Sequence, residues 1–162
     1  MNTTEVVIVG AGHAGVECAV ALRSAGFEGD IALLGEETDL PYDRPPLSKA
    51  LLSGERSADK IALRSEQSYS QSRIQYLPGT RVQSLDAAQR ELRTTDGTSW
   101  HFKWAVLATG ARARTVPGLQ GPGVFSIRQL ADVAALRPLL QPGSKLLVLG
   151  AGYLGLEAAC TA

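Results

Sequence analysis

The chain has 162 residues, 44% of them hydrophobic and 20% charged, a composition typical of a soluble globular protein with a sizeable core. Its formal net charge is zero, so neither nucleic acid nor an anionic membrane surface is indicated as a partner. No apolar run approaches the roughly 20 residues of a membrane span, and the N-terminus lacks the basic start of a signal peptide.

The first predicted elements form a β-α-β unit. Val6–Val9 is an unbroken β-branched run, as expected for a strand buried on both faces of a parallel sheet. An Ala-rich amphipathic helix is predicted over His13–Ala25, with Gly26 as the residue that ends it. Ile31–Leu34 is the second predicted strand. This order is typical of the start of a doubly wound fold.

Less regular structure is predicted next. Pro41–Pro46 contains three prolines and cannot continue a helix or a strand ladder, because proline lacks the N–H and restrains its predecessor. A short helix is predicted over Leu47–Leu52 and ends at Gly54. A second short helix, Glu66–Ser70, leads to a strand at Ile74–Tyr76.

Three further strands are predicted at Arg81–Leu85, Glu91–Thr95 and Ser99–Leu107. Asp96-Gly97, between the last two, is a strong hairpin signal. The predicted fold class is therefore α/β, with a Rossmann-like doubly wound parallel sheet and an inserted antiparallel hairpin that forms a flap beside it.

The last part of the chain predicts the start of a second Rossmann unit. A Pro- and Gly-rich linker around Pro117–Gly123 precedes a predicted helix at Leu130–Leu140 and a strand at Lys145–Leu149. A nucleotide-binding unit rarely begins and then stops, so we expect the chain to be part of a longer protein.

Gly10-Ala11-Gly12-His13-Ala14-Gly15 has the G-x-G-x-x-G pattern between a strand and a helix. The first glycine permits the tight turn, the second lets the backbone approach a pyrophosphate, and the third lets helix and strand pack closely. The helix N-terminus favours the negative charge of the pyrophosphate. Glu36 or Glu37 lies where a carboxylate would bind the ribose hydroxyls. The alternative is a Gly-rich turn with no ligand.

The pattern returns at Gly150-Ala151-Gly152-Tyr153-Leu154-Gly155, again after a predicted strand. Chance recurrence in this context is improbable, so two dinucleotide sites are predicted. The residue that would distinguish NAD from NADP lies roughly 20 positions further along such a motif.

Four motifs occur in a specific order: Gly10–Gly15, Pro41–Lys49, Ala108-Thr109-Gly110 and Gly150–Glu157. Together they resemble the oxygenase-coupled NADH–ferredoxin reductases of the putidaredoxin reductase and rubredoxin reductase type. The resemblance covers the whole chain and about the first two-fifths of such a protein. It implies that residues 1–115 are the first segment of an FAD-binding domain, 116–143 a linker and helix, and 144–162 the start of an NAD(P)-binding domain.

The resemblance also implies roles for individual residues. Lys49 lies close to the flavin and pairs with Glu157 near the place where nicotinamide stacks, which makes these two the candidate catalytic residues. A cation there would stabilise negative charge on the reduced ring. The implied cofactor-binding residues are Gly10, Gly12, Ala14, Gly15, Glu36, Arg44, Lys49, Val82, Thr109, Gly110, Arg128, Gly150, Gly152 and Gly155.

Each role has a simpler alternative. Arg44 and Lys49 could be ordinary solvated loop cations, and Val82 could be a packing residue of its strand. Arg128 could likewise be a residue with no contact to the cofactor. His13, where an apolar residue is more usual in this family, is interpreted as a partly exposed residue at the helix start and not as a proton-transfer group.

Cysteine usage separates this chain from the disulfide reductases of the superfamily, which carry C-x-x-x-x-C after the second strand. Asp39–Ser53 contains no cysteine, and Cys18 and Cys160 are interpreted as small buried apolar residues. Two distant cysteines make no disulfide framework, so a reduced cytoplasmic setting is expected. Electrons are expected to leave the flavin directly for an external acceptor.

Two functional hypotheses follow. In the first, the full-length enzyme takes a hydride from NAD(P)H onto FAD and passes single electrons to a 2Fe–2S ferredoxin or a rubredoxin, serving an oxygenase. In the second, the 162-residue chain is a non-catalytic FAD-binding remnant or module. A third interpretation, an NAD-only dehydrogenase, explains neither Thr109-Gly110 nor the second Gly-rich motif.

Overall fold

The computed structural model describes residues Met1 to Ala162. The chain divides into two compact units, one formed by residues 1–42 and 62–110 and the other by residues 43–61 and 111–162. None of its helices has the length and apolar character needed to span a membrane.

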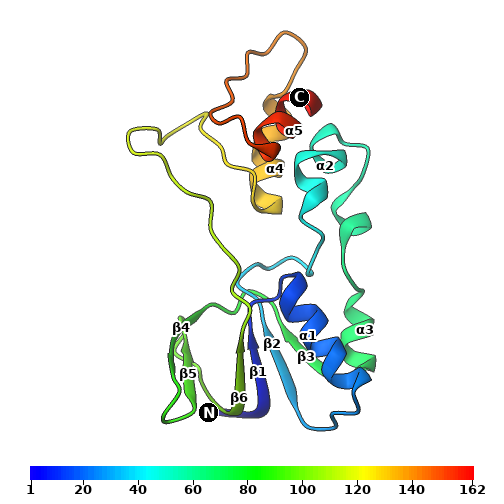
Figure 1. Cartoon of the computed structure of the whole chain (residues 1–162), viewed down its shortest axis with the longest axis vertical. Helices are drawn as coiled ribbons and strands as arrows, with labels where there is room; N and C mark the ends of the chain where they lie inside the picture. Colours follow the sequence, from blue (N-terminus) through cyan, green and yellow to red (C-terminus); the bar gives the residue numbers. More distant parts are fainter. The chain divides into compact units, whose positions relative to one another are not determined.

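The first unit is built on one six-stranded sheet with the order β3-β2-β1-β6-β5-β4 (Figure 1). β1 pairs in parallel with β2 and β6, and β2 with β3, whereas β5 pairs antiparallel with β4 and β6. The strands and helices of this unit are β1 (Asn2–Val9), α1 (His13–Ser24), β2 (Ile31–Leu34), α3 (Glu66–Gln71), β3 (Ile74–Leu77), β4 (Val82–Asp86), β5 (Glu91–Thr94) and β6 (Ser99–Leu107). The α/β class and the antiparallel hairpin are confirmed.

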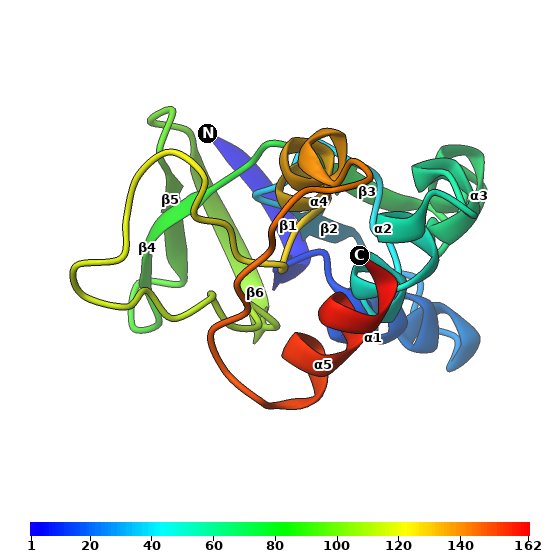
Figure 2. The ribbon, with the colours of Figure 1, turned by 90° about the horizontal axis from the view of Figure 1, so that it is seen from above.

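The alternation of side chains along β1 explains why both faces of the sheet are covered. Val6 and Ile8 pack in a cluster with Val16 and Ala19 of α1. The intervening Val7 belongs to a second cluster, formed with Leu92, Trp100 and Phe102 among others. Figures 1 and 2 show the corresponding layers, with α1 and α3 on one side of the parallel strands and the β4–β5 hairpin on the other. β1 is therefore the doubly buried strand that its β-branched run predicts.

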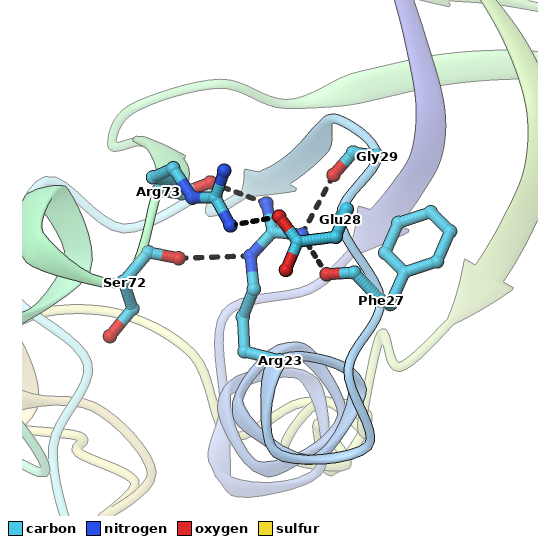
Figure 3. Close-up of polar contacts among 6 residues, drawn as sticks. All are labelled: Arg23, Phe27, Glu28, Gly29, Ser72 and Arg73. Atoms are coloured by element: carbon cyan, nitrogen blue, oxygen red, sulfur yellow. Dashed lines mark hydrogen bonds and ion pairs between the residues drawn. The ribbon is translucent and has the colours of Figure 1, made fainter.

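The C-terminus of α1 is closed by a Schellman motif and by an arginine. Gly26 has φ +84, and the N–H groups of Gly26 and Phe27 donate to the carbonyls of Arg23 and Leu22. The Arg23 guanidinium donates to four further carbonyls, those of Phe27 (2.6 Å), Gly29 (2.7 Å), Ser72 (2.9 Å) and Arg73 (2.7 Å), as Figure 3 shows. One side chain thus joins α1, the loop before β2 and the turn before β3.

The second unit contains short helices only. They are η1 (Pro45–Ser48), α2 (Ala50–Ser53), η2 (Ala58–Ile61), α4 (Leu130–Leu136), η3 (Arg137–Leu139) and α5 (Tyr153–Thr161). α4 begins with a capping box between Gln129 and Asp132, in which the Asp132 carboxylate accepts the N–H of Gln129 at 2.8 Å. α5 packs against η1 and α2.

Three predicted elements of this unit differ from the structure. The helix predicted over Leu47–Leu52 is interrupted at Lys49, whose φ of −125° and ψ of −115° lie outside the helical region. The helix predicted to reach Leu140 continues past Leu136 only as the 3₁₀ turn η3, which contains Pro138, a residue with no N–H to donate.

The predicted strand at Lys145–Leu149 is wrong, because this segment has no regular secondary structure. Leu147 and Leu149 are 81% and 63% exposed. A strand needs a neighbouring strand for its ladder, and every strand of this chain belongs to the sheet of the first unit. Hydrophobic pattern alone therefore overstated the structure of this segment.

Candidate functional site

The first Gly-rich loop follows β1, and two of its glycines are required by their neighbours. Gly10 has φ +108, and a Cβ there would lie 2.2 Å from the carbonyl oxygen of Ala108. A Cβ at Gly15 would lie 1.9 Å from the carbonyl oxygen of Gly10. These contacts bring the end of β6 and the start of α1 against the loop.

No contact within the protein requires a glycine at position 12, the remaining glycine of the pattern. Its φ of −81° and ψ of −172° are extended backbone that any residue adopts, and a Cβ there would meet no atom within 4 Å. It is the N-cap of α1, whose first turn has no acidic residue and whose cap makes no side-chain hydrogen bond. A helix N-terminus with open space above it is suited to a phosphate group.

The residues after β2 bring an acidic side chain to the same edge of the sheet. A Cβ at Gly35 would lie 3.0 Å from the Cβ of Ala11, so the end of β2 passes close to the loop. Glu37 accepts a hydrogen bond from the Tyr42 hydroxyl. Glu36 is 52% exposed and lies 3.6 Å from the Nε of Arg81. Of the two acids, Glu36 is exposed and Glu37 is half-buried.

Three other predicted residues lie in the first unit. β6 is followed by Ala108, whose N–H donates to the carbonyl of Val9 at 2.8 Å. Thr109 and Gly110 come next, and both are exposed. Val82 is half-buried at the start of β4 and packs on the core that contains Leu92. This contact agrees with the interpretation of Val82 as a packing residue of its strand.

The second Gly-rich loop repeats the geometry of the first. Gly150 has φ +111, and Gly152 is the extended N-cap of α5, with φ −77° and ψ 173°. A Cβ at Gly155 would lie 2.3 Å from the carbonyl oxygen of Gly150, whereas a Cβ at Gly152 would meet nothing within 4 Å. The positive φ of the first glycine, the extended N-cap at the second and the close contact of the third therefore recur in a segment that lacks strand neighbours.

Lys49 and Glu157 form an ion pair in the second unit. The Nζ of Lys49 lies 2.9 Å from the Oε1 of Glu157, and the two side chains are 52% and 31% exposed. The hydroxyl of Ser48 donates to Oε2 of the same carboxylate at 2.7 Å. The hydrogen bond from Ser48 and then that from Lys49 lower the pKa of Glu157 below its ordinary value.

Arg44 and Arg128 are also adjacent. The Nη1 of Arg44 donates to the carbonyl of Arg128 at 2.6 Å, and the N–H of Arg128 donates to Asp132 at 2.7 Å. The Nε of Arg128 donates to the carbonyl of Ala111 at 3.1 Å. Both arginine residues are half-buried. The guanidinium of Arg44 is therefore held against the backbone of Arg128, and that of Arg128 against the backbone of Ala111.

The predicted site residues thus fall into two sets, one in each unit. Gly10–Gly15, Glu36, Val82 and Thr109-Gly110 belong to the first unit, and the remainder belong to the second. Sequence reasoning missed Ser48 and Asp132. A serine or an aspartate carries no sequence signal that it hydrogen-bonds a site residue. The partner of Ser48, Glu157, lies 109 positions away along the chain.

One of the two cysteines is more exposed than the sequence predicted. Cys18 is half-buried beside the core of α1, but Cys160 is exposed, and not buried as predicted, because its side of α5 is uncovered. His13 is exposed at the start of α1, as expected. The structure contains no cluster of three or more His, Cys, Asp or Glu residues able to hold a metal ion.

Comparison with known proteins agrees with this fold. Residues 4–162 match the family described as pyridine nucleotide-disulphide oxidoreductase. Putidaredoxin reductase from Pseudomonas putida is 40% identical over 168 residues, which cover 100% of this chain and 40% of the relative. Rhodocoxin reductase from Rhodococcus erythropolis is 42% identical over 97% of this chain and 37% of the relative.

Among solved structures, the covalent putidaredoxin reductase–putidaredoxin complex matches with a TM-score of 0.93 and 39% identity, over 99% of this chain and 40% of that chain. NADH:rubredoxin oxidoreductase from Clostridium acetobutylicum shares the fold, with a TM-score of 0.89 at 22% identity, over 99% of this chain and 42% of that chain. The chain therefore spans about two-fifths of the length of these proteins.

Proposed function

The chain belongs to the pyridine nucleotide-disulphide oxidoreductase family, and we propose that it is the flavin-binding N-terminal part of an NAD(P)H-dependent ferredoxin reductase. The observation that carries the proposal is Gly12. Its neighbours in the pattern, Gly10 and Gly15, are required by close backbone contacts, whereas Gly12 faces open space at a helix N-terminus. A glycine at this position is explained by a ligand that comes close to the protein backbone, as the pyrophosphate of FAD would.

The residues around the loop fit the remainder of the dinucleotide. Glu36, at the end of β2, would accept hydrogen bonds from the adenosine ribose, and Ala14 lies exposed in the first turn of α1 beside the pyrophosphate position. Val82 would contact adenine through its backbone, and Thr109-Gly110 would pass the cofactor at the end of β6. The bound flavin would supply the redox chemistry, by accepting a hydride from NAD(P)H and releasing single electrons.

The second unit would supply positive charge near the flavin. Glu157 limits the positions open to the Lys49 ammonium, because an ion pair at 2.9 Å opposes rotation of the lysine side chain. Arg44 and Arg128 add two more cations to the same unit. Fixed positive charge of this kind stabilises electron density as it accumulates on a bound ligand. The loop Gly150–Gly155 would start the NAD(P)-binding domain.

We propose a 2Fe–2S ferredoxin as the electron acceptor of the whole protein, with rubredoxin as the alternative and an oxygenase as the enzyme served. Curated relatives are putidaredoxin reductase and the ferredoxin–NAD(+) reductase subunit of a benzene 1,2-dioxygenase system, 40% and 43% identical to this chain. No cysteine lies between Asp39 and Ser53, where disulfide reductases of this type carry their redox pair. Electrons would therefore leave the flavin directly.

The division of labour along the chain follows from the same proposal. Residues 1–115 would form the first segment of the FAD domain, 116–143 the connection, and 144–162 the start of the NAD(P) domain. Asp43–Ile61 belongs to the compact unit that contains residues 111–162. The Pro-rich segment with Arg44 and Lys49 would thus carry FAD-binding residues into the unit that begins the NAD(P) domain.

The test uses a pair of matched valine variants. Gly12→Val places a branched side chain in the proposed pyrophosphate position, and Gly152→Val does the same in the second loop, with the same extended backbone and open space. In the full-length protein, we expect Gly12→Val to lose FAD, measured as flavin absorbance of the purified protein, while Gly152→Val retains FAD and loses nicotinamide binding. FAD at the normal stoichiometry in folded Gly12→Val would refute the assignment of the first loop.

A second measurement addresses catalysis. If the 162-residue chain binds FAD and NADH bleaches it, the chain itself is competent for hydride transfer. If it binds FAD that NADH does not reduce, it acts as a flavin-binding module under these conditions, which is the alternative function. The same NADH addition to the full-length protein, with a ferredoxin present, separates the reductase from the binding module. Only the proposed reductase then passes electrons from the reduced flavin to the ferredoxin.

A further inference from the structure

Ser48 is the most deeply buried polar residue of the second unit. Its exposed fraction is 0%, although it directly precedes Lys49, whose side chain is 52% exposed. Its hydroxyl donates to Oε2 of Glu157 at 2.7 Å, and its carbonyl accepts the hydroxyl proton of Thr161 at 3.0 Å. Both polar ends of this residue are therefore bonded to α5.

The backbone conformation of this segment directs two neighbouring side chains to one carboxylate. η1 ends at Ser48, and Lys49 leaves the helical region before α2 begins. As a result, Ser48 bonds Oε2 of Glu157 while Lys49 contacts Oε1. Because each carboxylate oxygen of Glu157 has a different partner, the orientation of the carboxylate plane is fixed. The position of the Lys49 ammonium group relative to that plane is fixed with it.

Without the hydroxyl, the ion pair would be of the ordinary exposed kind. Such pairs are loosely ordered, because two long side chains lose conformational entropy to maintain one geometry. A hydrogen bond from a buried donor that cannot reach water opposes that disorder, since breaking it leaves the hydroxyl without a partner. Ser48 therefore limits the motion of Glu157, and Glu157 limits that of Lys49.

We propose that Ser48 is a positioning residue, which orients the Glu157 carboxylate and through it the Lys49 ammonium that the proposed function places near the flavin. The inference rests on the proposed function only for the identity of the ligand that Lys49 faces. The hydrogen-bonded arrangement is a property of the chain itself. Its consequences are measurable with no cofactor bound.

The experiment measures the pKa of Glu157 from the carboxyl carbon shift of the 162-residue chain labelled with ¹³C-glutamate. Ser48→Ala removes the hydroxyl, so we expect the pKa of Glu157 to rise toward its ordinary value. Two controls separate this effect from general loosening. Ser53→Ala removes an exposed hydroxyl bonded locally to Ala50, and Thr161→Val removes the bond to the Ser48 carbonyl without touching the carboxylate. Both should leave the pKa of Glu157 unchanged.

A pKa of Glu157 that is the same in folded Ser48→Ala as in the unaltered chain would overturn the proposal. If Ser48→Ala does not fold, Ser48→Cys retains the buried volume and weakens the hydrogen bond, and the same upward shift is expected. A failure of FAD binding would count against the proposed function and leave this result intact.

In the flavin-loaded full-length protein, the rate of reduction by NADH provides the functional readout. We expect Ser48→Ala to slow reduction with no change in FAD content. The double variant Ser48→Ala/Glu157→Gln should be no slower than Glu157→Gln alone, because the hydroxyl acts through that carboxylate. Additive losses would show that Ser48 acts by another route and would overturn the positioning role.

Discussion

The Arg23 guanidinium provides the sharpest test of what stabilises the first unit. Three of its four hydrogen bonds to carbonyls are half-buried, those to Phe27, Gly29 and Ser72. A hydrogen bond of this kind contributes about 1 kcal/mol net, and the exposed bond to Arg73 contributes little. Arg23→Ala is therefore expected to lower the free energy of unfolding by about 3 kcal/mol.

A lysine at this position tests geometry as distinct from charge. The guanidinium spans its carbonyls as a fork from three nitrogens, whereas a single ammonium nitrogen cannot reach carbonyls on opposite sides at once. Arg23→Lys should thus lose about 2 kcal/mol, more than half of the alanine effect. Retention of full stability in Arg23→Lys would show that charge near the end of α1 is sufficient and that the fork is not required.

Urea denaturation followed by circular dichroism measures both variants. Glu28→Ala is the matched control, because it removes the exposed ion pair between Glu28 and Arg73 in the same cluster and leaves the bonds of Arg23 in place (Figure 3). Its stability should be close to that of the unaltered chain. A loss below about 1 kcal/mol in Arg23→Ala would refute the argument that the carbonyls depend on this side chain.

Three further predictions follow from the same structure. Gly15→Ala would place a Cβ 1.9 Å from the Gly10 carbonyl oxygen, so we expect a loss of several kcal/mol in urea denaturation, and unchanged stability would contradict the packing reason for this glycine. Burial raises the pKa values of Tyr69 and Tyr76 to about 12, so the stability they contribute should be lost as pH rises from about 10 through about 12; a phenolate absorbance titration with an ordinary midpoint would contradict this. The lowered pKa of Glu157 means that its contribution to stability is present above the ordinary glutamate pKa and lost as pH falls through its lowered pKa, so the hydrogen-exchange protection factors of α5 should fall in acid.

The first unit was predictable because its signals are local. The β-branched run of β1, the amphipathic helix that follows and the hairpin at Asp96-Gly97 depend on residues close in sequence, and each appears where predicted. The pairing of β6 with both β1 and β5 needed the structure, because its two neighbours lie at different distances along the chain. The expected flap is continuous with the parallel strands for this reason.

The candidate site was predictable in outline only. Glycine spacing indicated both Gly-rich turns at helix starts, and the family resemblance indicated that Lys49 pairs with Glu157. The part played by Ser48 could not be predicted, since a buried hydroxyl has the same sequence signature as any small residue of a loop. Its role depends on a residue 109 positions later and on the backbone turn at Lys49, neither of which has a local pattern.

The two Gly-rich loops show which part of their shared geometry is encoded locally. Gly10 and Gly150 have φ of +108 and +111, and in both loops the third glycine abuts the carbonyl of the first. Only Gly10 meets a neighbouring strand, however, because a Cβ there would strike Ala108 whereas one at Gly150 would meet nothing within 4 Å. The positive φ of the first glycine and the close approach of the third therefore form in both loops, whereas only the first loop also meets the end of a neighbouring strand. The first loop lies beside the chain that follows β2 as well, because a Cβ at Gly35 would lie 3.0 Å from the Cβ of Ala11, and it is the loop at which we propose that FAD binds.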